Sequence, residues 1–351
     1  MVVSKHKIVV GFSGGVDSLV TCLLLKKRGY EVYAVTLIFN NSHKTTAFQE
    51  HVKKAAALLN INHEFFDVRS SFKRVLDYFK QGYLSAKTPN PCVFCNQHVK
   101  WPKLFAYAAR VGALKVATGH YAQKKALNEK TFFTKGLDSE KDQSFFLWSL
   151  TPEQVEQIEL PLGKMYKAEV KEIAEKNGFT IFSRQKESTG PCFTGKNYRH
   201  TLKGMLTDTE LPGKGNFLSE DGEVLGRHDG YLFYTISQRK GLGLNLKGKH
   251  FVKKLIPESN QVVLAHAGRL WSREFYLKNW TIHYPPVLEN CEVEIKIRYR
   301  SQKAKGVLKN TGDRLCIKLS EPEWAITPGQ TAAIYMDEYL VGGGYIDEVT
   351  N

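Results

Sequence analysis

Three cysteines in proline- and glycine-rich segments are the side chains of this sequence best suited to covalent chemistry. Cys92 and Cys95 form a C-x-x-C pair in the string TPNPCVFCN, and Cys192 lies in the string STGPCFTG. Such turn-forming surroundings predict that these thiols lie on loops rather than inside helices. A thiolate or persulfide is a strong nucleophile, so these residues are suited to attack an activated carbonyl carbon.

Other uses of the loop cysteines fit the sequence less well. A thioredoxin-like redox pair needs a βαβ context, which does not surround Cys92 and Cys95. A structural zinc needs a fourth ligand, and neither His98 nor His120 stands at a standard spacing. The remaining cysteines lie in helix-like or strand-like segments, where we expect packing roles: Cys22, Cys291 and Cys316.

A glycine-rich turn, GFSGGVDS (11–18), stands between an apolar run and a helical pattern. Gly14 and Gly15 allow backbone amides to converge on an anion, and the following helix adds its positive N-terminus. Asp17 would orient Mg²⁺ or cap the helix. The string has no Walker lysine and no G-x-G-x-x-G pattern. It predicts a site for ATP phosphates, and the alternative is a tight turn capped by Ser13 or Asp17.

The elements that must position these residues alternate between strand and helix patterns in the first half of the chain. Strands are predicted at 7–12, 31–39, 63–68 and 115–118, and helices at 16–28 and 49–59. This order predicts a parallel, doubly wound α/β sheet. Ligands bind such sheets at the carboxyl ends of the strands, where residues 13–18 and 119–120 would both lie.

The second half of the chain changes character after about residue 205. Short alternating segments separated by turns, such as 262–264, 293–299 and 332–335, predict antiparallel strands in one or two small barrels. We therefore expect three domains: a catalytic domain at 1–205, a central β-rich domain at 206–272 and a C-terminal β-barrel at 273–351.

Composition limits the classes of protein that the chain can belong to. Its 351 residues include 42% hydrophobic and 24% charged residues, which is typical of a globular protein. No apolar run is long enough for a membrane span, and no secretory signal opens the chain, so we expect a cytoplasmic protein with reduced cysteines. A net charge of +15 favours a polyanionic partner such as nucleic acid, although a generally basic enzyme would share it.

Two stretches concentrate the positive charge. Residues 234–254 carry six Lys or Arg and no acid, and residues 294–309 carry six against one Glu. In the second stretch Lys296, Arg298 and Arg300 alternate, which predicts that they share one face of a strand. We interpret both stretches as surfaces for RNA phosphates, and an ordinary solvated strand face is the alternative. His200 and His228 are expected to serve packing or turns.

Several strings, in order along nearly the whole chain, resemble the tRNA-specific 2-thiouridylase family of PP-loop ATP pyrophosphatases. They are GFSGGVDS (11–18), TPNPCVFCN (88–96), ATGHYAQ (117–123), KDQSFFL (141–147), STGPCFTG (188–195), HDGYLFYTISQRKGLG (228–243) and TPGQ (327–330). The resemblance implies an adenine nucleotide hydrolase-like (PP-loop) domain, a small central domain and a C-terminal β-barrel. It also implies thiolation of C2 of the wobble uridine in tRNA, with ATP, Mg²⁺ and a persulfide from a relay protein or cysteine desulfurase.

The resemblance assigns roles to individual positions. Cys95 resembles the nucleophile and Cys192 the persulfide-bearing cysteine, while Asn90, Pro91 and Cys92 match the stretch beside the target base. ATP-contacting positions match Gly11, Phe12, Ser13, Gly14, Gly15, Val16, Asp17, Ser18, Leu37 and Gly119. Positions that contact tRNA match Lys141, Asp142, Gln143, Arg298 and Tyr299, and positions for tRNA recognition match His120 and Gln330.

Cys92 departs from the family pattern, because many members have Asp at this position. Together with Cys95 and Cys192, it gives the chain three expected loop thiols. Three thiolates could hold an iron–sulfur cluster in which one iron has no protein ligand. Two mechanisms therefore stay open: a persulfide relay through Cys95 and Cys192, and sulfur transfer through a cluster held by Cys92, Cys95 and Cys192. Zinc or a disulfide are lesser alternatives.

Two rival functions make different use of the motifs. An amide-forming or ammonia-dependent ATP pyrophosphatase would need the glycine-rich turn but no thiols. A non-enzymatic RNA-binding module would need the basic barrels but no ATP turn, so the SGGVDS string argues against it. The sequence favours an ATP-dependent sulfurtransferase acting on tRNA.

Overall fold

The computed structural model describes residues 6–41, 45–184, 190–195, 197–289 and 291–350. The chain forms two compact units. The first contains residues up to 74, residues 92–189 and the short segment 338–341, and the second contains residues 75–91, 190–337 and 342–351. The glycine-rich turn and the C-x-x-C pair thus belong to the first unit, and both basic stretches belong to the second.

A five-stranded parallel sheet forms the core of the first unit. Its strands run in the order β3-β2-β1-β4-β7. Their bounds are β1 (Lys7–Gly11), β2 (Glu31–Ile38), β3 (Asn62–Asp67), β4 (Lys115–Ala117) and β7 (Ile158–Glu159). Every neighbouring pair is parallel. The predicted doubly wound α/β fold is therefore confirmed.

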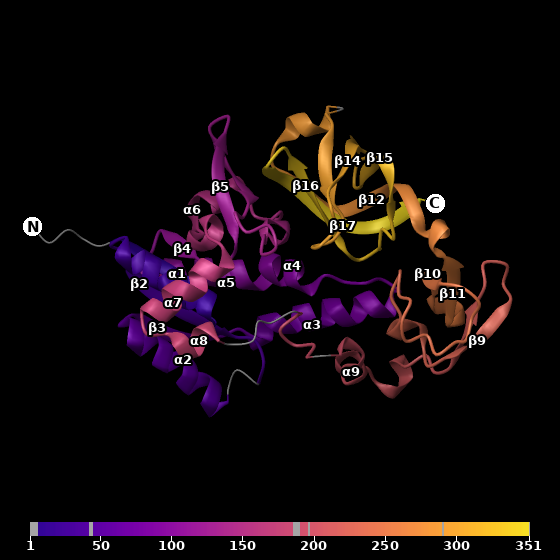
Figure 1. Ribbon diagram of the computed structural model, residues 1–351, viewed down its shortest axis with the longest axis horizontal. Helices are drawn as coiled ribbons and strands as arrows, with labels where there is room; N and C mark the ends of the chain where they lie inside the picture. The colour runs from indigo at the N-terminus through magenta and orange to yellow at the C-terminus, as the bar shows by residue number, and fades with distance from the viewer. Residues whose placement is uncertain (1–5, 42–44, 185–189, 196, 290, 351) are drawn as a thin grey trace, which may run out of the picture. The chain divides into compact units, whose positions relative to one another are not determined.

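Helices cover both faces of this sheet. Ile8 and Val10 pack in one apolar cluster with residues of α1 (Val16–Lys27), α2 (Thr46–Leu59) and α7 (Lys167–Lys176). Figure 1 shows α1 and α7 as neighbouring helices over the sheet. On the opposite face, a Cβ at Gly11 would lie 3.2 Å from the side chain of Leu104 in α5 (Trp101–Val111). Alternate residues of β1 thus face opposite helical layers.

The C-x-x-C pair lies in a helix, so the predicted loop is wrong for Cys92 and Cys95. They belong to α4 (Pro91–Cys95), and Pro91 occupies the first helical position, where its fixed φ favours a helix and its missing N–H costs nothing. A π-helical turn, η2 (Asn96–Lys100), follows and joins α4 to α5. The N–H of Trp101 donates to the carbonyl of Asn96 five residues back, as a π-turn requires.

Smaller elements complete the first unit. They are β5 (Ala122–Leu127), β6 (Lys130–Lys135), η3 (Ser144–Phe146), α6 (Pro152–Gln157), η4 (Pro161–Lys164) and α8 (Thr180–Ser183). The helix α3 (Arg69–Leu84) crosses from the first unit into the second. None of the described helices is long and apolar enough to cross a membrane.

A four-stranded sheet, in the order β10-β11-β8-β9, forms the central part of the second unit. Its strands are β8 (Gly215–Leu218), β9 (Val224–His228), β10 (His250–Ile256) and β11 (Gln261–His266). Phe79 and Tyr83 of α3 pack in its apolar cluster with Phe217 and Leu232. The predicted antiparallel arrangement is wrong for β8 and β11, the two central strands of the sheet, which pair in parallel.

Six antiparallel strands form a closed C-terminal barrel in the order β12-β15-β14-β13-β16-β17, with β17 pairing back onto β12. They are β12 (Trp271–Ile282), β13 (Val293–Lys296), β14 (Ala304–Asn310), β15 (Leu315–Trp324), β16 (Thr331–Met336) and β17 (Tyr339–Thr350). The predicted central β-rich domain and C-terminal barrel are confirmed.

One predicted strand is too long. The segment 293–299 was expected to continue as a strand, but β13 ends at Lys296. Ser301 then closes a turn, since both its N–H and its hydroxyl donate to the Arg298 carbonyl, at 3.1 and 3.0 Å. Lys296, Arg298 and Arg300 therefore do not share a strand face.

The three cysteines that were expected to pack in the core differ in their exposure to solvent. Cys22 is fully buried and Cys316 is 8% exposed, as predicted. Burial raises the pKa of the Cys22 thiol far above its usual range, so this thiol stays protonated. Cys291 is exposed, so its predicted packing role is wrong. Its thiol lies 3.3 Å from the Pro286 carbonyl in the connection that precedes β13.

Candidate active site

The glycine-rich turn joins the carboxyl end of β1 to α1. Gly14 has φ of +77°, which favours glycine, and a Cβ there would lie 2.9 Å from a Val52 methyl carbon. Gly15 is the N-cap residue of α1 and provides no side chain for capping. The alternative interpretation, a tight turn whose helix is capped by Ser13 or Asp17, is therefore not supported.

Serine hydroxyls brace the turn from within. The Ser18 hydroxyl donates to the Gly15 carbonyl at 2.9 Å and accepts the Ser13 N–H at 3.2 Å. The N–H of Gly15 donates to the Ser13 hydroxyl oxygen at 3.4 Å. Within the described part of the chain, the N–H groups of Gly14, Val16 and Asp17 donate no hydrogen bond. Amides left open at a helix N-terminus form an anion cradle that suits ATP phosphates.

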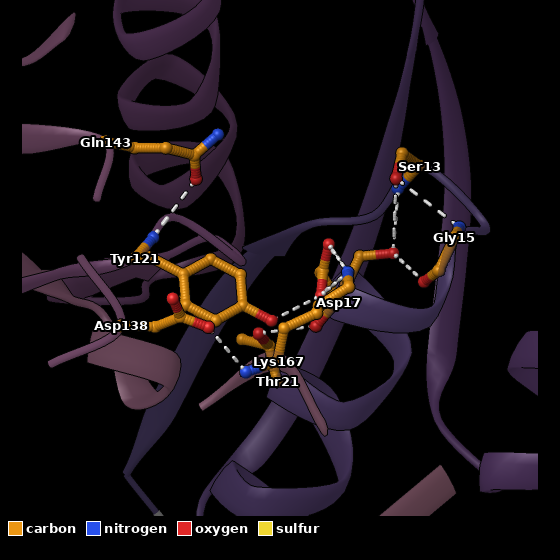
Figure 2. A network of polar contacts seen from close by, with 9 residues as sticks. Ser13, Gly15, Asp17, Thr21, Tyr121, Asp138, Gln143 and Lys167 are labelled. Atoms are coloured by element: carbon orange, nitrogen blue, oxygen red, sulfur yellow. Dashed lines mark hydrogen bonds and ion pairs between the residues drawn. The ribbon is translucent and has the colours of Figure 1, made fainter. Parts of the chain in front are cut away.

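Asp17 is held by a cation and a hydroxyl rather than by the start of its own helix (Figure 2). The Lys167 ammonium lies 2.6 and 2.7 Å from the two carboxylate oxygens, and the Tyr121 hydroxyl donates to one of them at 2.8 Å. The Lys167 side chain is 10% exposed, whereas that of Asp17 is 35% exposed. A metal ion at Asp17 would therefore share this carboxylate with the lysine ammonium.

Further contacts fix the position of Lys167 and of the start of α1. The backbone N–H of Lys167 donates to Asp138 Oδ2 at 2.9 Å, as Figure 2 shows. Gly119, two residues after the end of β4, has no room for a side chain, because a Cβ there would lie 2.9 Å from Asp17 Cβ and 3.0 Å from the Asp17 carbonyl carbon. The predicted convergence of residues 13–18 and 119–120 at the carboxyl edge of the sheet is therefore confirmed.

Two neighbouring elements support the turn from other sides. His51 of α2 lies with Nε2 3.0 Å from the Gly14 carbonyl oxygen. On β2, the Thr36 hydroxyl donates to the Phe12 carbonyl at 2.6 Å, and Leu37 is buried near the end of the strand. The carbonyl groups of Phe12 and Gly14, at the start and middle of the turn, are therefore each held by a side chain from a neighbouring element.

The cysteine pair lies in α4 of the same unit as the turn. Cys95 is 9% exposed, and Asn96, which follows it, is fixed by donating its amide N–H to the Phe146 carbonyl at 3.1 Å. Burial raises the pKa of the Cys92 thiol, although the nearby Lys100 ammonium opposes the rise. Cys92 is therefore mainly protonated at neutral pH and is a weaker nucleophile than an exposed thiol.

Cys192 is exposed and lies in a turn of the second unit, as the sequence predicted. Ser188 and Thr189, which open its sequence motif, lie outside the described residues. Thr194 is buried beside it and donates its hydroxyl to the Pro191 carbonyl at 3.1 Å, which closes the turn around Cys192.

His120 follows Gly119 at the carboxyl edge of the sheet. Its Nδ1 lies 2.6 Å from the Thr118 hydroxyl, and its ring stacks on the fully buried Trp101 with centroids 5.8 Å apart. Burial, helped by the charge of Lys100, lowers the pKa of His120 to about 3. His120 is therefore neutral at physiological pH and offers a hydrogen-bonding ring rather than a positive charge.

Two of the three residues predicted to contact tRNA at 141–143 hold their own segment in place. The Asp142 carboxylate is 4% exposed and accepts the N–H groups of Gly136 and Ser144, at 3.1 and 3.0 Å. The Gln143 side-chain carbonyl accepts the N–H of Tyr121 at 3.1 Å, which links it to the network around Asp17 (Figure 2). These contacts fix the backbone on which Lys141 stands.

The second unit holds the remaining predicted site residues. The Gln330 amide donates to the Thr88 carbonyl at 3.0 Å, and the Asn90 amide lies 3.5 Å from the Thr331 hydroxyl. Gln330 thus fixes the segment that leads to Pro91 and α4. In the turn after β13, the Arg298 guanidinium lies 5.8 Å from the Trp324 ring centroid, and Tyr299 lies beside the Lys296 ammonium. His228 accepts the Gly230 N–H at 3.0 Å, as expected of a turn residue, whereas His200 is exposed.

Sequence reasoning missed Lys167, Tyr121 and His51. Tyr121 stands in the quoted string ATGHYAQ, directly after two predicted site residues, and that position was the one available signal. Lys167 and His51 lie in helices whose charged faces read as ordinary solvated surface. Only the tertiary structure places them against the turn.

The sequence matches three family profiles in consecutive order. Residues 6–196, more than half of the chain, match the family described as tRNA methyl transferase HUP domain. Residues 200–266 match the tRNA methyl transferase PRC-barrel domain, and residues 272–346 match the Aminomethyltransferase beta-barrel domain.

Similar proteins cover almost the full chain. The chain is 41% identical over 347 residues to the tRNA-specific 2-thiouridylase MnmA 2 of Phocaeicola vulgatus, which covers 98% of each chain. It is 40% identical to tRNA-specific 2-thiouridylase MnmA 1 of Bacteroides fragilis, over 99% of this chain and 98% of that one. Among solved structures, a U34-tRNA thiolase of Methanococcus maripaludis with its 4Fe–4S cluster has 20% identity and a TM-score of 0.35, covering 57% of this chain and 64% of that one. That similarity is too low to transfer a ligand.

Proposed function

Because the chain belongs to the tRNA-specific 2-thiouridylase family, we propose that it is an ATP-dependent sulfurtransferase that converts the wobble uridine of tRNA to 2-thiouridine. The uridine O2 attacks the α-phosphorus of ATP, and pyrophosphate leaves. Sulfur then attacks C2, and AMP departs with the former O2. The substrates are ATP, tRNA and a persulfide sulfur.

One observation carries this proposal: a phosphate cradle and a cysteine pair lie in the same compact unit. The open amides of Gly14, Val16 and Asp17 are suited to the pyrophosphate end of ATP. The absence of a Walker lysine from GFSGGVDS favours cleavage between the α and β phosphates. Cys95, in α4 of the same unit, supplies the thiol that an amide-forming ATP pyrophosphatase would not need.

The ion pair at Asp17 gives that residue two tasks. Lys167 neutralises the carboxylate, so that it does not repel the phosphates bound at the start of α1. Mg²⁺, when bound with ATP, supplies charge neutralisation at the phosphates, and Asp17 is the residue of the turn that would hold it. Tyr121 orients the same carboxylate by donating its hydroxyl proton.

In the proposed relay, Cys192 receives the terminal sulfur as a persulfide from a relay protein or cysteine desulfurase. This sulfur attacks C2 of the adenylated uridine, and Cys95 attacks the Cys192 sulfur to release the product. A disulfide between the two cysteines forms, and a thiol reductant restores both. Cys92 is an accessory in this scheme. In the alternative scheme Cys92, Cys95 and Cys192 hold an iron–sulfur cluster, and all three are equally required.

The other predicted residues keep their proposed roles. We propose that Asn90 and Pro91 lie beside the target base, that Lys141, Arg298 and Tyr299 contact tRNA, and that His120 and Gln330 take part in its recognition. Leu37 and Gly119 are proposed to border ATP. The proposal includes a cytoplasmic location and the division into domains at 1–205, 206–272 and 273–351.

A product assay tests the function. Purified protein is incubated with ATP, Mg²⁺, a wobble-uridine tRNA and a persulfide donor, and AMP, pyrophosphate and 2-thiouridine are measured. We expect AMP and pyrophosphate to require tRNA, and Cys95→Ser to abolish 2-thiouridine. ADP and phosphate as products, or full activity of Cys95→Ser, would contradict the proposal, and the second result would indicate the amide-forming class.

A further inference from the structure

A glycine-rich loop on the central part of the second unit, residues 239–250, borders a hollow of about 550 Å³. We call it the RKG loop. Its lining residues are Arg239, Gly241, Leu242, Gly243, Leu244, Asn245, Leu246, Gly248, Lys249 and His250. No acidic side chain lines this hollow, and no acid occurs in the sequence between Asp229 and Glu258. The loop is therefore a positively charged concave surface.

The cations of the RKG loop are not neutralised by acids. Its basic side chains are all exposed, and none makes an ion pair with any described residue: Arg239, Lys240, Lys247 and Lys249. The C-terminal basic stretch differs, because Lys303 pairs with Glu294 and Lys305 pairs with Glu292. All four cations of the RKG loop are thus left without an acidic partner among the described residues, whereas two of the six in the C-terminal basic stretch are paired.

The backbone of the loop adds donors to this charge. Gly241, Gly243 and Gly248 have φ of +72°, +71° and +84°, which favour glycine. From Gly243 to Lys249, no N–H donates a hydrogen bond to another described residue. Exposed amides of this kind bind water or an incoming anion.

The loop has a fixed shape although its backbone is open. Leu242 is 9% exposed, and it packs with Leu244 and Leu246 into the apolar cluster of the central sheet. Leu244 lies so close to Gly226 that a Cβ on that glycine would be 2.4 Å from a leucine methyl carbon. A pre-shaped cationic loop loses little conformational entropy when it binds.

We propose that the RKG loop is a docking site for the sugar–phosphate backbone of tRNA, with Arg239 and Lys249 each contacting a phosphate. This inference rests on the proposed function and adds a contact surface separate from Arg298 and Tyr299. Exposed cations spread along a loop suit a row of phosphates, whereas a small anion favours a buried, enclosed site. Binding through phosphates is independent of base sequence.

Fluorescence anisotropy with labelled tRNA, measured from 50 to 300 mM salt, tests the proposal. The variant is the double substitution Arg239→Gln and Lys249→Gln. The matched control is Lys253→Gln, which makes the same kind of charge change in β10 at a lysine already paired with Glu220. We expect the double variant to bind about 10-fold more weakly and to lose about 1.4–1.8 from the slope of log K against log salt. The control should stay within twofold.

Further measurements separate the outcomes. Millimolar inorganic phosphate should not displace tRNA from the wild-type protein. An unchanged affinity and salt slope in the double variant, or displacement of tRNA by millimolar phosphate, would overturn the docking site. The proposed function would still stand in that case, provided that the wild-type protein forms 2-thiouridine. If the wild-type protein forms no 2-thiouridine, the proposed function fails first.

Discussion

Replacing Lys167 by Met removes the ammonium that contacts Asp17 and keeps an unbranched apolar side chain of similar length. The variant loses the two contacts at 2.6 and 2.7 Å but keeps the Tyr121 hydroxyl at 2.8 Å from the carboxylate. Asp17 therefore stays in place with one hydrogen-bond donor and without a counter-charge. We expect the loss to reduce both the stability of the first unit and its affinity for ATP.

The burial of the two side chains sets the size of the stability effect. Exposed ion pairs contribute about 0–1 kcal/mol, and breaking a buried pair costs about 3–5 kcal/mol. Lys167 is 10% exposed but Asp17 is 35% exposed, so solvent screens the carboxylate and the pair lies between these limits. We expect a loss of about 1–2 kcal/mol, which corresponds to a Tm lower by about 2–8 °C.

The effect on ATP follows from repulsion. An uncompensated carboxylate at roughly 8 Å from a phosphate charge costs about 2 kcal/mol at an effective dielectric constant of about 20. The KM for ATP should therefore rise by about 10- to 30-fold in the AMP-release assay. Lys176→Met in the same helix is the control, because its pair with Glu172 is exposed and should contribute almost nothing. A Lys167→Met protein with the wild-type KM for ATP and a Tm within 1 °C of wild type would refute the reasoning.

Four other predictions follow from the site. Asp17→Ala should abolish AMP formation and leave tRNA affinity within a few-fold, as measured by anisotropy; an active variant would remove Asp17 from the ATP site. Cys92→Asp should retain much 2-thiouridine formation in air under the persulfide relay, whereas activity seen only without oxygen and lost in this variant would indicate the cluster. Arg298→Ala should weaken tRNA binding and lower the salt slope by about one, and an unchanged slope would leave this residue with only its packing on Trp324. Burial lowers the pKa of His120 to about 3, so its stabilising effect is complete above pH 6.5 and is lost as the pH falls toward 3; His120→Gln should flatten the acid-side fall of Tm, and parallel curves would contradict this.

The sequence was most informative where local pattern and tertiary structure agree. The apolar run 7–12, the glycines that follow and the helical spacing of 16–28 each predict their own element, and together they predict the edge of the sheet where the turn lies. Gly119 could be placed near Asp17 because the carboxyl ends of parallel strands meet at one edge. The close approach of 2.9 Å that excludes a side chain at Gly119 required the structure.

Local pattern failed where one contact overrides it. The alternation of Lys296, Arg298 and Arg300 is typical of a strand, yet the bonds from Ser301 to Arg298 close a turn there. The string TPNP reads as a turn up to Pro91, but this proline begins the helix that carries Cys92 and Cys95. The partner of Asp17 could not be found from sequence, because nothing in the local surroundings of Lys167 marks it as the counter-charge.

The π-turn η2 sets the rotational phase of the cysteine pair about the helix axis. An α-helix advances about 100° per residue, and a π-turn is equivalent to one residue inserted into an α-helix. Deleting one residue from 96–100 would let α4 and α5 run on as a single regular helix. Since Trp101 and Leu104 are anchored in the core, the thiols of Cys92 and Cys95 would then be turned by about 100° from their present direction. The direction in which these sulfur atoms point is therefore governed by the number of residues between Cys95 and Trp101.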